Sequence, residues 1–275
     1  VPFLAEALKR GVLIKGEMEM AYLACPHPLI AVTGTNGKGS TAQFVRAMAE
    51  AAGLRVNVFT SPHLIRVNER IRLGGELAGD EALAGALNRV ADADAGLSYF
   101  EALTSAAYLL FSENEPDLCV IEVGAGGAGD ATSVIVDADV CVVTPISRDH
   151  EGMFGVSGEA AIARLKAGIL RDGRAAVIAE QSAIAQAVLL EEARWRGANA
   201  YAAGRNWKAR WDGDSFVYEG ERLEVRAPWL GIAGQVQAQN AGTACAVIEQ
   251  LDDERLTRDP MAAGLRGATW PARMR

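Results

Sequence analysis

The chain is poor in the features that mark several large classes of protein. It has four cysteines in 275 residues, far apart and without a Cys-x-x-Cys pair, which argues against a disulfide framework or a cysteine-rich zinc site. No apolar run approaches 18 residues, so no segment is predicted to span a membrane. Residues 1–16 carry scattered charges and no cleavage-site pattern, which argues against a signal peptide. We therefore predict buried free thiols in a reducing, cytoplasmic compartment.

Positive charge is also scarce, since the formal net charge is −8 and the pI is about 5.1. A nucleic-acid binder normally presents a basic face, so nucleic acid is not expected as a partner. A local cluster of cations can still attract an anionic ligand into a cleft of an acidic protein. Aromatic residues make up only 6% of the chain, which suits an α/β protein better than an all-β protein.

Strand-like and helix-like segments alternate along most of the sequence. The strands are predicted at 29–33, 55–60, 117–123, 139–144 and 175–179, and the helices at 40–52, 80–92, 99–113, 157–170 and 181–196. This alternation predicts an α/β fold with a mostly parallel sheet and helices on both faces. We expect one domain over 1–275, with a helical segment at 1–28, a small antiparallel β subregion at 200–230 and a helix from about 235 to 251.

A glycine-rich turn joins the first predicted strand to the first predicted helix. It reads Gly34-Thr35-Asn36-Gly37-Lys38-Gly39-Ser40. Glycines let backbone N–H groups approach phosphate oxygens, the start of a helix adds positive potential, and Lys38 supplies a mobile charge. The turn therefore predicts a site for a nucleoside triphosphate, although a plain strand-to-helix turn is the alternative.

The turn departs from the general phosphate-loop pattern at one position. That pattern places Ser or Thr directly after the lysine, where its hydroxyl binds magnesium. Here Gly39 follows Lys38, and the first hydroxyl comes at Ser40.

Polar residues also follow the other predicted strands. Ser61-Pro62-His63 follows the second strand, Glu122 ends the third, and Asp149-His150 lies just past the fourth. Ligands of parallel α/β sheets gather at the carboxyl ends of the strands, so these segments are predicted to meet at one edge. Taken singly, Ser61 could shape a turn and His150 could be an ordinary packed or surface histidine. A carboxylate buried at the end of an apolar strand favours a bound cation at Glu122.

Several blocks together resemble the folylpolyglutamate synthase/dihydrofolate synthase family of the Mur ligase superfamily. They occur in the family's order and extend over nearly the whole chain: the phosphate loop; Thr60-Ser61-Pro62-His63-Leu64 with Asn68-Glu69-Arg70-Ile71; Glu122-Val123-Gly124 through Asp130-Ala131-Thr132; Asp149-His150; Lys166-Ala167-Gly168-Ile169; 237–240; and Trp270-Pro271 with Arg273.

The resemblance implies that residues 1–275 form a P-loop NTPase-like, ATP-binding domain, the central domain of the Mur ligases. It also implies an enzyme, an ATP-dependent amide ligase. ATP would phosphorylate the carboxylate of dihydropteroate or a folyl(poly)glutamate, and the amino group of L-glutamate would attack the acyl phosphate. The implied metal is Mg²⁺ at two sites, with Ser61 and Glu122 at the first and Glu122 and His150 at the second. Lys38, Lys166 and His150 are the implied catalytic residues. The family is usually monomeric.

The resemblance also implies roles for residues that carry no signal alone. Lys166 is carbamylated in the family, which turns a cation into an anion near the metals; a solvated helix lysine is the alternative. Asn240 and Arg273 are implied to contact the nucleotide, along with the loop residues 34–40. Phe100 and His63 are implied on the folate side, although Phe100 could equally be a core residue.

The match is imperfect. Ala128-Gly129 stands where the family usually has Arg-Leu, Leu165 where it has Glu, and Val236 where it has His. The family normally continues beyond this point into a second α/β domain that binds glutamate, which we expect to be absent from this chain. Two alternatives remain: a non-catalytic nucleotide-binding paralogue or fragment, and a Mur-type ligase that adds an amino acid to a cell-wall precursor.

Overall fold

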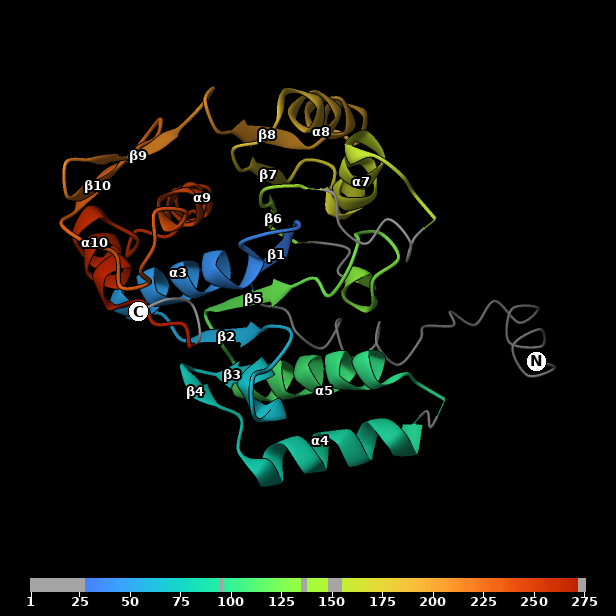
Figure 1. The fold of residues 1–275 in the computed structure, drawn as a ribbon. Helices are drawn as coiled ribbons and strands as arrows, with labels where there is room; N and C mark the ends of the chain where they lie inside the picture. Colours follow the sequence, from blue (N-terminus) through green and yellow to red (C-terminus); the bar gives the residue numbers. More distant parts are fainter. Residues whose placement is uncertain (1–27, 94–95, 135–137, 148–154, 272–275) are drawn as a thin grey trace.

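The structure is a computed structural model that describes residues 28–93, 96–134, 138–147 and 155–271 (Figure 1). Of the predicted helical segment at 1–28, only residue 28 is described. Cys25, Asp149, His150 and Arg273 also lie outside the described residues. Within them, Cys119, Cys141 and Cys245 are buried thiols outside any disulfide, as predicted. No described helix is both long and apolar enough to cross a membrane.

An eight-stranded sheet forms the centre of the molecule, in the order β4-β3-β2-β5-β1-β6-β7-β8. Six strands are parallel: β1 (Leu29–Thr33), β2 (Val56–Phe59), β5 (Leu118–Glu122), β6 (Val140–Val143), β7 (Ala175–Ile178) and β8 (Asn199–Ala202). The edge strands β3 (Ile71–Leu73) and β4 (Glu76–Leu77) are antiparallel. The sheet is mostly parallel, as the alternation of segments predicted.

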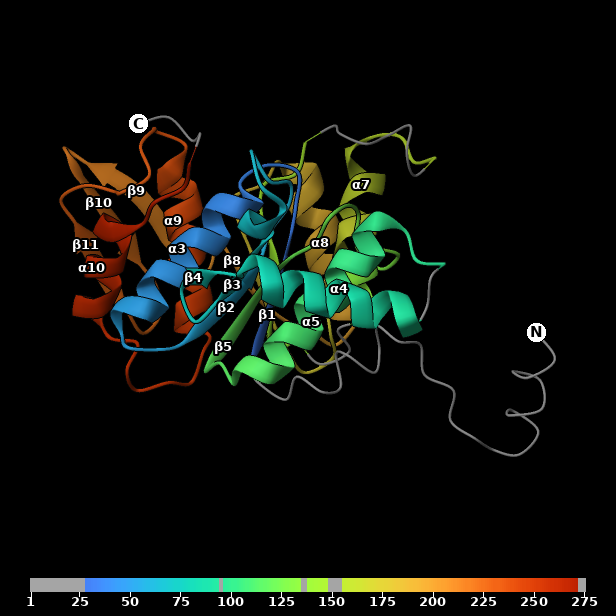
Figure 2. The same ribbon diagram turned by 90° about the horizontal axis from the view of Figure 1, so that it is seen from below.

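Helices cover both faces of this sheet (Figures 1 and 2). One face carries α3 (Lys38–Ala51), α9 (Gln237–Glu249) and α10 (Arg258–Gly267), and the other carries α4 (Asp80–Ala93), α5 (Tyr99–Asn114), α7 (Glu159–Lys166) and α8 (Ala183–Trp195). Strand β1 shows why both faces must be covered, since all five of its residues are buried. Ile30 and Val32 pack into the α3 core, and Leu29 and Ala31 into the α5 core.

Short 3₁₀ helices complete the main unit: η1 (Val67–Arg70), η2 (Ala131–Val134) and η3 (Ala167–Ile169). The predicted helix at 157–170 is therefore divided into α7 and η3, because the helix changes to tighter winding after Lys166.

A second, three-stranded antiparallel sheet packs on α9. It consists of β9 (Lys208–Asp212), β10 (Ser215–Glu219) and β11 (Glu224–Ala227), in the order β11-β10-β9. A Cβ atom placed on Gly242 of α9 would lie 2.3 Å from the Cβ of Ala209, so strand and helix are in close contact there. The antiparallel strands predicted in this region are confirmed.

The start of the antiparallel subregion differs from the predicted range of 200–230. Residues Ala200–Ala202 pair in parallel with β7 and belong to the main sheet. Two further elements were not predicted, the β3–β4 hairpin and α10. Strand β4 has only two residues, both exposed, so it carries no apolar pattern. Helix α10 has a weak sequence signal because it has only ten residues and Gly264 interrupts it.

Candidate active site

The phosphate loop lies at the carboxyl end of β1, between the ends of β5 and β6. The N–H groups of Thr35 and Asn36 donate to the carbonyl of Pro145, at 3.0 and 3.1 Å. The Thr35 hydroxyl donates to the Ser147 carbonyl at 3.2 Å, and the Asn36 amide donates to the Ser147 hydroxyl at 3.1 Å. The loop is thus held by the segment that follows β6.

Gly37 is the N-cap of α3 and has a φ angle of 84°, in the left-handed region that favours glycine. A Cβ atom at this position would lie 2.1 Å from Oδ1 of Asn240. Asn240 is 4% exposed, and its amide also donates to Oε1 of Gln237 at 2.9 Å. The predicted nucleotide residue Asn240 therefore lies against the phosphate loop, although it comes from a distant part of the chain.

The first turn of α3 presents backbone donors at the rim of the sheet. Thr41 donates to the carbonyl of Gly37 at 2.8 Å, so the N–H groups of Lys38, Gly39 and Ser40 precede the first hydrogen bond of the helix. Ser40 itself is buried, with 3% of its surface exposed. These three N–H groups, together with the partial positive charge of the helix end, form a site suited to an anion.

Two lysines converge on one carbonyl of the loop. The Lys38 ammonium donates to the carbonyl oxygens of Gly34 and Thr35, at 3.2 and 3.4 Å. The Lys166 ammonium donates to the same Gly34 carbonyl at 2.8 Å and is only 4% exposed. Lys166 is therefore not a solvated helix lysine. The Lys38 ammonium adds positive charge beside the N-terminus of α3 in a protein that is acidic overall.

Glu122 ends β5 next to the loop and is 3% exposed. Its Oε2 accepts a hydrogen bond of 3.1 Å from the backbone N–H of Ser61, which follows β2. The same oxygen would lie 3.5 Å from a Cβ atom on Gly39. The structure thus brings Ser61, Glu122 and the first turn of α3 together, as the sequence predicted.

The loop after Glu122 is folded around the carboxylate of Asp130. This carboxylate accepts from the N–H groups of Gly124 and Ala125, at 3.3 and 2.8 Å, and from the N–H and hydroxyl of Thr132, at 3.0 and 2.7 Å. The Gly126 carbonyl accepts from the hydroxyl of Thr33 at 2.8 Å. In the sequence, Asp130 is one member of the block Asp130-Ala131-Thr132 that resembles the family, and no local signal indicates that it organises this loop.

The same loop connects the Lys166 segment to Phe100. A Cβ atom on Gly127 would lie 2.2 Å from the Leu165 carbonyl, and one on Gly124 would lie 2.4 Å from the Phe100 ring. The Phe100 ring also packs against Phe59, with 5.9 Å between the ring centroids. Phe100 is therefore a partly buried packing residue that lies directly beside the loop after Glu122.

His63 lies on the β2 side of the site. Its Nδ1 accepts a hydrogen bond of 3.0 Å from Nε of Arg70, whose guanidinium lies 5.6 Å from the centroid of the Tyr99 ring. The segment after His63 is fixed by Glu69, which accepts from the N–H groups of residues 64–66 at 2.7–3.1 Å. These backbone hydrogen bonds lower the pKa of the Glu69 carboxyl.

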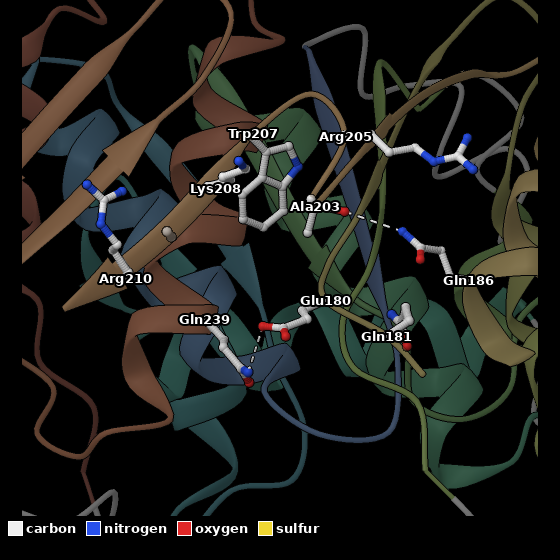
Figure 3. Close-up of a pocket in the computed structure, with 11 residues that line it drawn as sticks. Glu180, Gln181, Gln186, Ala203, Arg205, Trp207, Lys208, Arg210 and Gln239 are labelled. Atoms are coloured by element: carbon white, nitrogen blue, oxygen red, sulfur yellow. Dashed lines mark hydrogen bonds between the residues drawn. The ribbon is translucent and has the colours of Figure 1, made fainter. Parts of the chain in front are cut away.

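A polar groove of about 630 Å³ adjoins the other side of the site (Figure 3). Its walls come from the ends of β7 and β8, from β9 and from the start of α9, and Gln239 donates to Glu180 across it at 3.0 Å. Gln181 connects the groove to the phosphate loop, because it accepts from Ile146 N–H at 2.9 Å and donates to the Thr144 carbonyl at 3.1 Å. No predicted site residue lines the groove, but Gln239 directly precedes Asn240.

The predicted residues thus occupy one rim of the sheet. The order across it is His63 and Ser61 after β2, Glu122 on β5, the phosphate loop after β1, and the polar groove beyond β6. His150 and Arg273 lie outside the described residues and cannot be placed. Among the described residues, no three His, Cys, Asp or Glu side chains form a metal cluster.

Comparisons with known proteins identify the family of the chain. Residues 32–248 match the Mur ligase middle domain. The dihydrofolate synthase/folylpolyglutamate synthase of Escherichia coli is 34% identical over 251 residues, which are 90% of this chain and 58% of that protein. The chain therefore spans about 58% of the length of this relative.

Two solved structures share the fold. One is E. coli FolC in complex with ADP, without folate substrate; it has a TM-score of 0.85 and 30% identity, over 99% of this chain and 67% of that one. The other is a bifunctional folylpolyglutamate synthase/dihydrofolate synthase with Mn, AMPPNP and L-glutamate bound, with a TM-score of 0.81 and 31% identity, over 94% of this chain and 63% of that one. The chain belongs to the Mur ligase family, in its folylpolyglutamate synthase/dihydrofolate synthase branch.

Proposed function

We propose that the chain is the nucleotide-binding part of an ATP-dependent amide ligase. The enzyme would join L-glutamate to dihydropteroate, to a folyl(poly)glutamate, or to both. One observation carries this proposal: the N-terminus of α3, the side chains of two lysines and the buried carboxylate of Glu122 meet at one rim of the sheet, although they come from separate segments of the chain. The named activity of the E. coli relative and the ligands of the two structural neighbours support it.

The phosphates of ATP would bind over the first turn of α3. Transfer of a phosphoryl group depends mainly on position and on neutralisation of charge. The N–H groups of Lys38, Gly39 and Ser40 would hold the β- and γ-phosphates, together with the flexible amine of Lys38. That amine now contacts carbonyls of the loop, and phosphate oxygens would replace them as its partners.

The residues at Glu122 fit a magnesium ion. Mg²⁺ is commonly held by one or two carboxylates together with substrate phosphates and water. The carboxylate of Glu122, at the end of β5, lies next to the first turn of α3, where the phosphates would bind. Ser61 would supply a hydroxyl oxygen next to it, and His150 would take part in a second site. The ion would neutralise charge on the phosphates during transfer.

Lys166 would carry a carboxyl group on its amine, as in the related ligases. The carbamylated amine keeps one N–H, so its hydrogen bond to the Gly34 carbonyl could persist. The added carboxylate would turn a buried cation into an anion near the metal sites, where an ammonium would be repelled. The buried position of Lys166 beside the phosphate loop supports this role.

The acid substrate would approach from the β2 side, past His63 and Phe100. The site has its phosphate-binding turn on one side of Glu122 and these two residues on the other, which leaves the substrate carboxylate facing the γ-phosphate. The nucleoside would extend in the opposite direction, past Asn240 toward the polar groove. Arg273 would contact the nucleotide as well.

The reaction can be tested in two steps with the chain as it exists. First, calorimetry should show Mg²⁺-dependent binding of ATP. Second, ATP should form an acyl phosphate with dihydropteroate or with a folyl(poly)glutamate, which hydroxylamine traps as a hydroxamate, with one ADP released for each hydroxamate. Trapping with a UDP-linked muramoyl substrate in place of these two would indicate a cell-wall ligase. Nucleotide binding without trapping on any of the three substrates would indicate a non-catalytic nucleotide-binding protein and contradict the proposal.

A further inference from the structure

A tryptophan from the C-terminal end of the described chain packs on the phosphate loop. A Cβ atom placed on Gly39 would lie 3.2 Å from Cζ2 and 3.5 Å from Cε2 of Trp270. The same Cβ would lie 3.5 Å from Oε2 of Glu122. The indole, the first turn of α3 and the buried carboxylate therefore border one small volume.

The segment that carries Trp270 is fixed along α3. A Cβ atom on Gly264 of α10 would lie 2.4 Å from the Cα of Met48 and 2.5 Å from the Ala47 carbonyl, so the two helix backbones touch. Leu265 and Ala268 are fully buried in the same core. Trp270 is only partly buried, and it reaches the N-terminal end of α3 from this anchored segment.

This packing accounts for the departure of the loop from the general pattern. A Ser or Thr directly after Lys38 would place its Cβ closer to the indole than side chains normally approach, and its hydroxyl would need further space. Gly39 leaves that space to the ring. The metal-binding hydroxyl that the general pattern places there must then come from another segment, and Ser61 lies beside Glu122.

We propose that Trp270 is a positioning residue of the nucleotide site. Its indole fills the volume after Lys38, holds the first turn of α3 at a fixed distance from Glu122, and excludes water from that side of the carboxylate. The inference rests on the proposed function, because it assigns Trp270 to the same nucleotide site.

The first test is a double-mutant cycle between positions 39 and 270, with MgADP binding measured by calorimetry. Gly39→Ser should weaken MgADP affinity by about tenfold or more, because the serine and the indole compete for one volume. In the Trp270→Ala background, the same Gly39→Ser change should weaken affinity by no more than about twofold. Gly85→Ser is the matched control, since nothing lies within 4 Å of a Cβ on that helix glycine, and it should leave affinity unchanged.

The second test uses the intrinsic fluorescence of the five tryptophans. MgADP binding should change the emission of the wild-type chain, and Trp270→Phe should remove most of that change. Trp229→Phe should keep it, because Trp229 is 57% exposed and borders a different pocket. A purely structural role for Trp270 would leave the ligand-induced change in place while lowering thermal stability.

The outcomes separate this inference from the proposed function. If wild-type chain binds MgADP but the effects at positions 39 and 270 simply add, or if Trp270→Phe keeps the fluorescence change, the role of Trp270 is wrong and the proposed function stands. If wild-type chain does not bind MgADP, both are wrong.

Discussion

Two glutamates are equally deep in the molecule and differ in almost everything else. Glu122 is 3% exposed and ends the central strand β5, while Glu249 is 1% exposed and ends helix α9. Each carboxylate lies where an unpartnered charge would be strongly unfavourable. Burial alone therefore does not distinguish an acid that binds a ligand from an acid that holds the fold.

Glu249 is surrounded by donors from the protein itself. It accepts from Tyr201 OH at 2.9 Å and from the Leu223 N–H at 3.0 Å, and also from the hydroxyl of Tyr218 and the N–H of Arg222. These donors come from β8, from β10 and from the turn before β11. Glu249 thus ties α9 to both sheets, and its hydrogen bonds explain its burial without any ligand.

Glu122 has different neighbours. It lies at the carboxyl edge of the parallel sheet, next to the N-terminus of α3 and the segment after β2. The side chains of Lys38 and Lys166 contact the adjoining turn. The difference teaches that the position of a buried acid, at the rim beside a helix N-terminus or among donors of the protein itself, separates the two cases, and the proposed role of Glu122 rests on that position.

The largest expected effect is on stability at the structural acid. Glu249→Gln places an amide N–H₂ among four hydrogen-bond donors, so the free energy of unfolding should fall by about 3 kcal/mol. The melting temperature should then fall by roughly 6–12 °C, measured by circular dichroism. Affinity for MgADP at a temperature where the variant is folded should stay within about twofold of wild type. A Glu249→Gln variant as stable as wild type would show that Glu249 does not hold the fold.

The next effect concerns the phosphate loop. Lys38→Ala removes the mobile ammonium, so ATP affinity measured by calorimetry should fall by about 100-fold, the loss expected for a charge-assisted contact. The melting temperature should change little, because the hydrogen bonds of the Lys38 amine within the described part of the chain go to carbonyls of its own loop. Wild-type affinity in this variant would refute the phosphate site.

A glutamate-to-glutamine substitution at Glu122 should have a smaller effect than at Glu249, and the effect should be on magnesium-dependent ATP binding. Glu122→Gln should weaken ATP binding in the presence of Mg²⁺ by about tenfold, because a neutral amide is a poor magnesium ligand. Binding of ATP without Mg²⁺ should not weaken, since the negative charge near the phosphates is gone. If the magnesium titration of the variant matches that of wild type, Glu122 does not bind the ion.

The last prediction concerns the pH dependence of stability. Burial and the hydrogen bond to Glu249 raise the pKa of Tyr201 from 10.0 to about 12, and burial raises the pKa of the Cys141 thiol from 9.0 to about 11. Raised pKa values mean that the folded state favours the neutral forms. The contribution of these two groups to the free energy of unfolding is therefore fully present below pH 9 and is lost as the pH rises to about 12. Urea unfolding across this range should show the decline.

Two variants measure the share of each group. Cys141→Ala should reduce the slope of stability against pH between about 9 and 11, and Tyr201→Phe should reduce it between about 10 and 12. Part of the slope should remain in both variants, because burial also raises the pKa of the Cys245 thiol and of the Tyr218 hydroxyl. If the free energy of unfolding of the wild-type chain is constant up to pH 12, folding does not raise the pKa of either group.

Much of the fold could be predicted because each strand is a short apolar run bounded by turn residues. Strand β1 and helix α3 lie within two residues of the predicted positions, and the order of the rim follows from parallel strands ending at one edge. The β3–β4 hairpin and α10 were missed because their stability comes from packing on α3 and β2 rather than from local pattern. The parallel pairing of β8 depends on its neighbour β7 and has no local signal.

The site shows the same division. Lys38, Ser61 and Glu122 could be predicted from strand ends, and the structure brings them together. Asp130, Gln181 and Trp270 make contacts that fix the loops, and none of them has a local sequence signal for that contact. Asp130 and Trp270 belong to blocks that resemble the family, but the resemblance did not indicate what they touch. Asn240 and Lys166 were found only by resemblance, because a helix asparagine and a helix lysine are ordinary locally.

The most direct test of the account is a crystal structure of the chain grown with Mn²⁺ and a non-hydrolysable ATP analogue. The account predicts an anomalous peak beside the Glu122 carboxylate, with the β- and γ-phosphates over the N–H groups of Lys38, Gly39 and Ser40. Manganese away from Glu122, or a nucleotide bound elsewhere than at the start of α3, would contradict it.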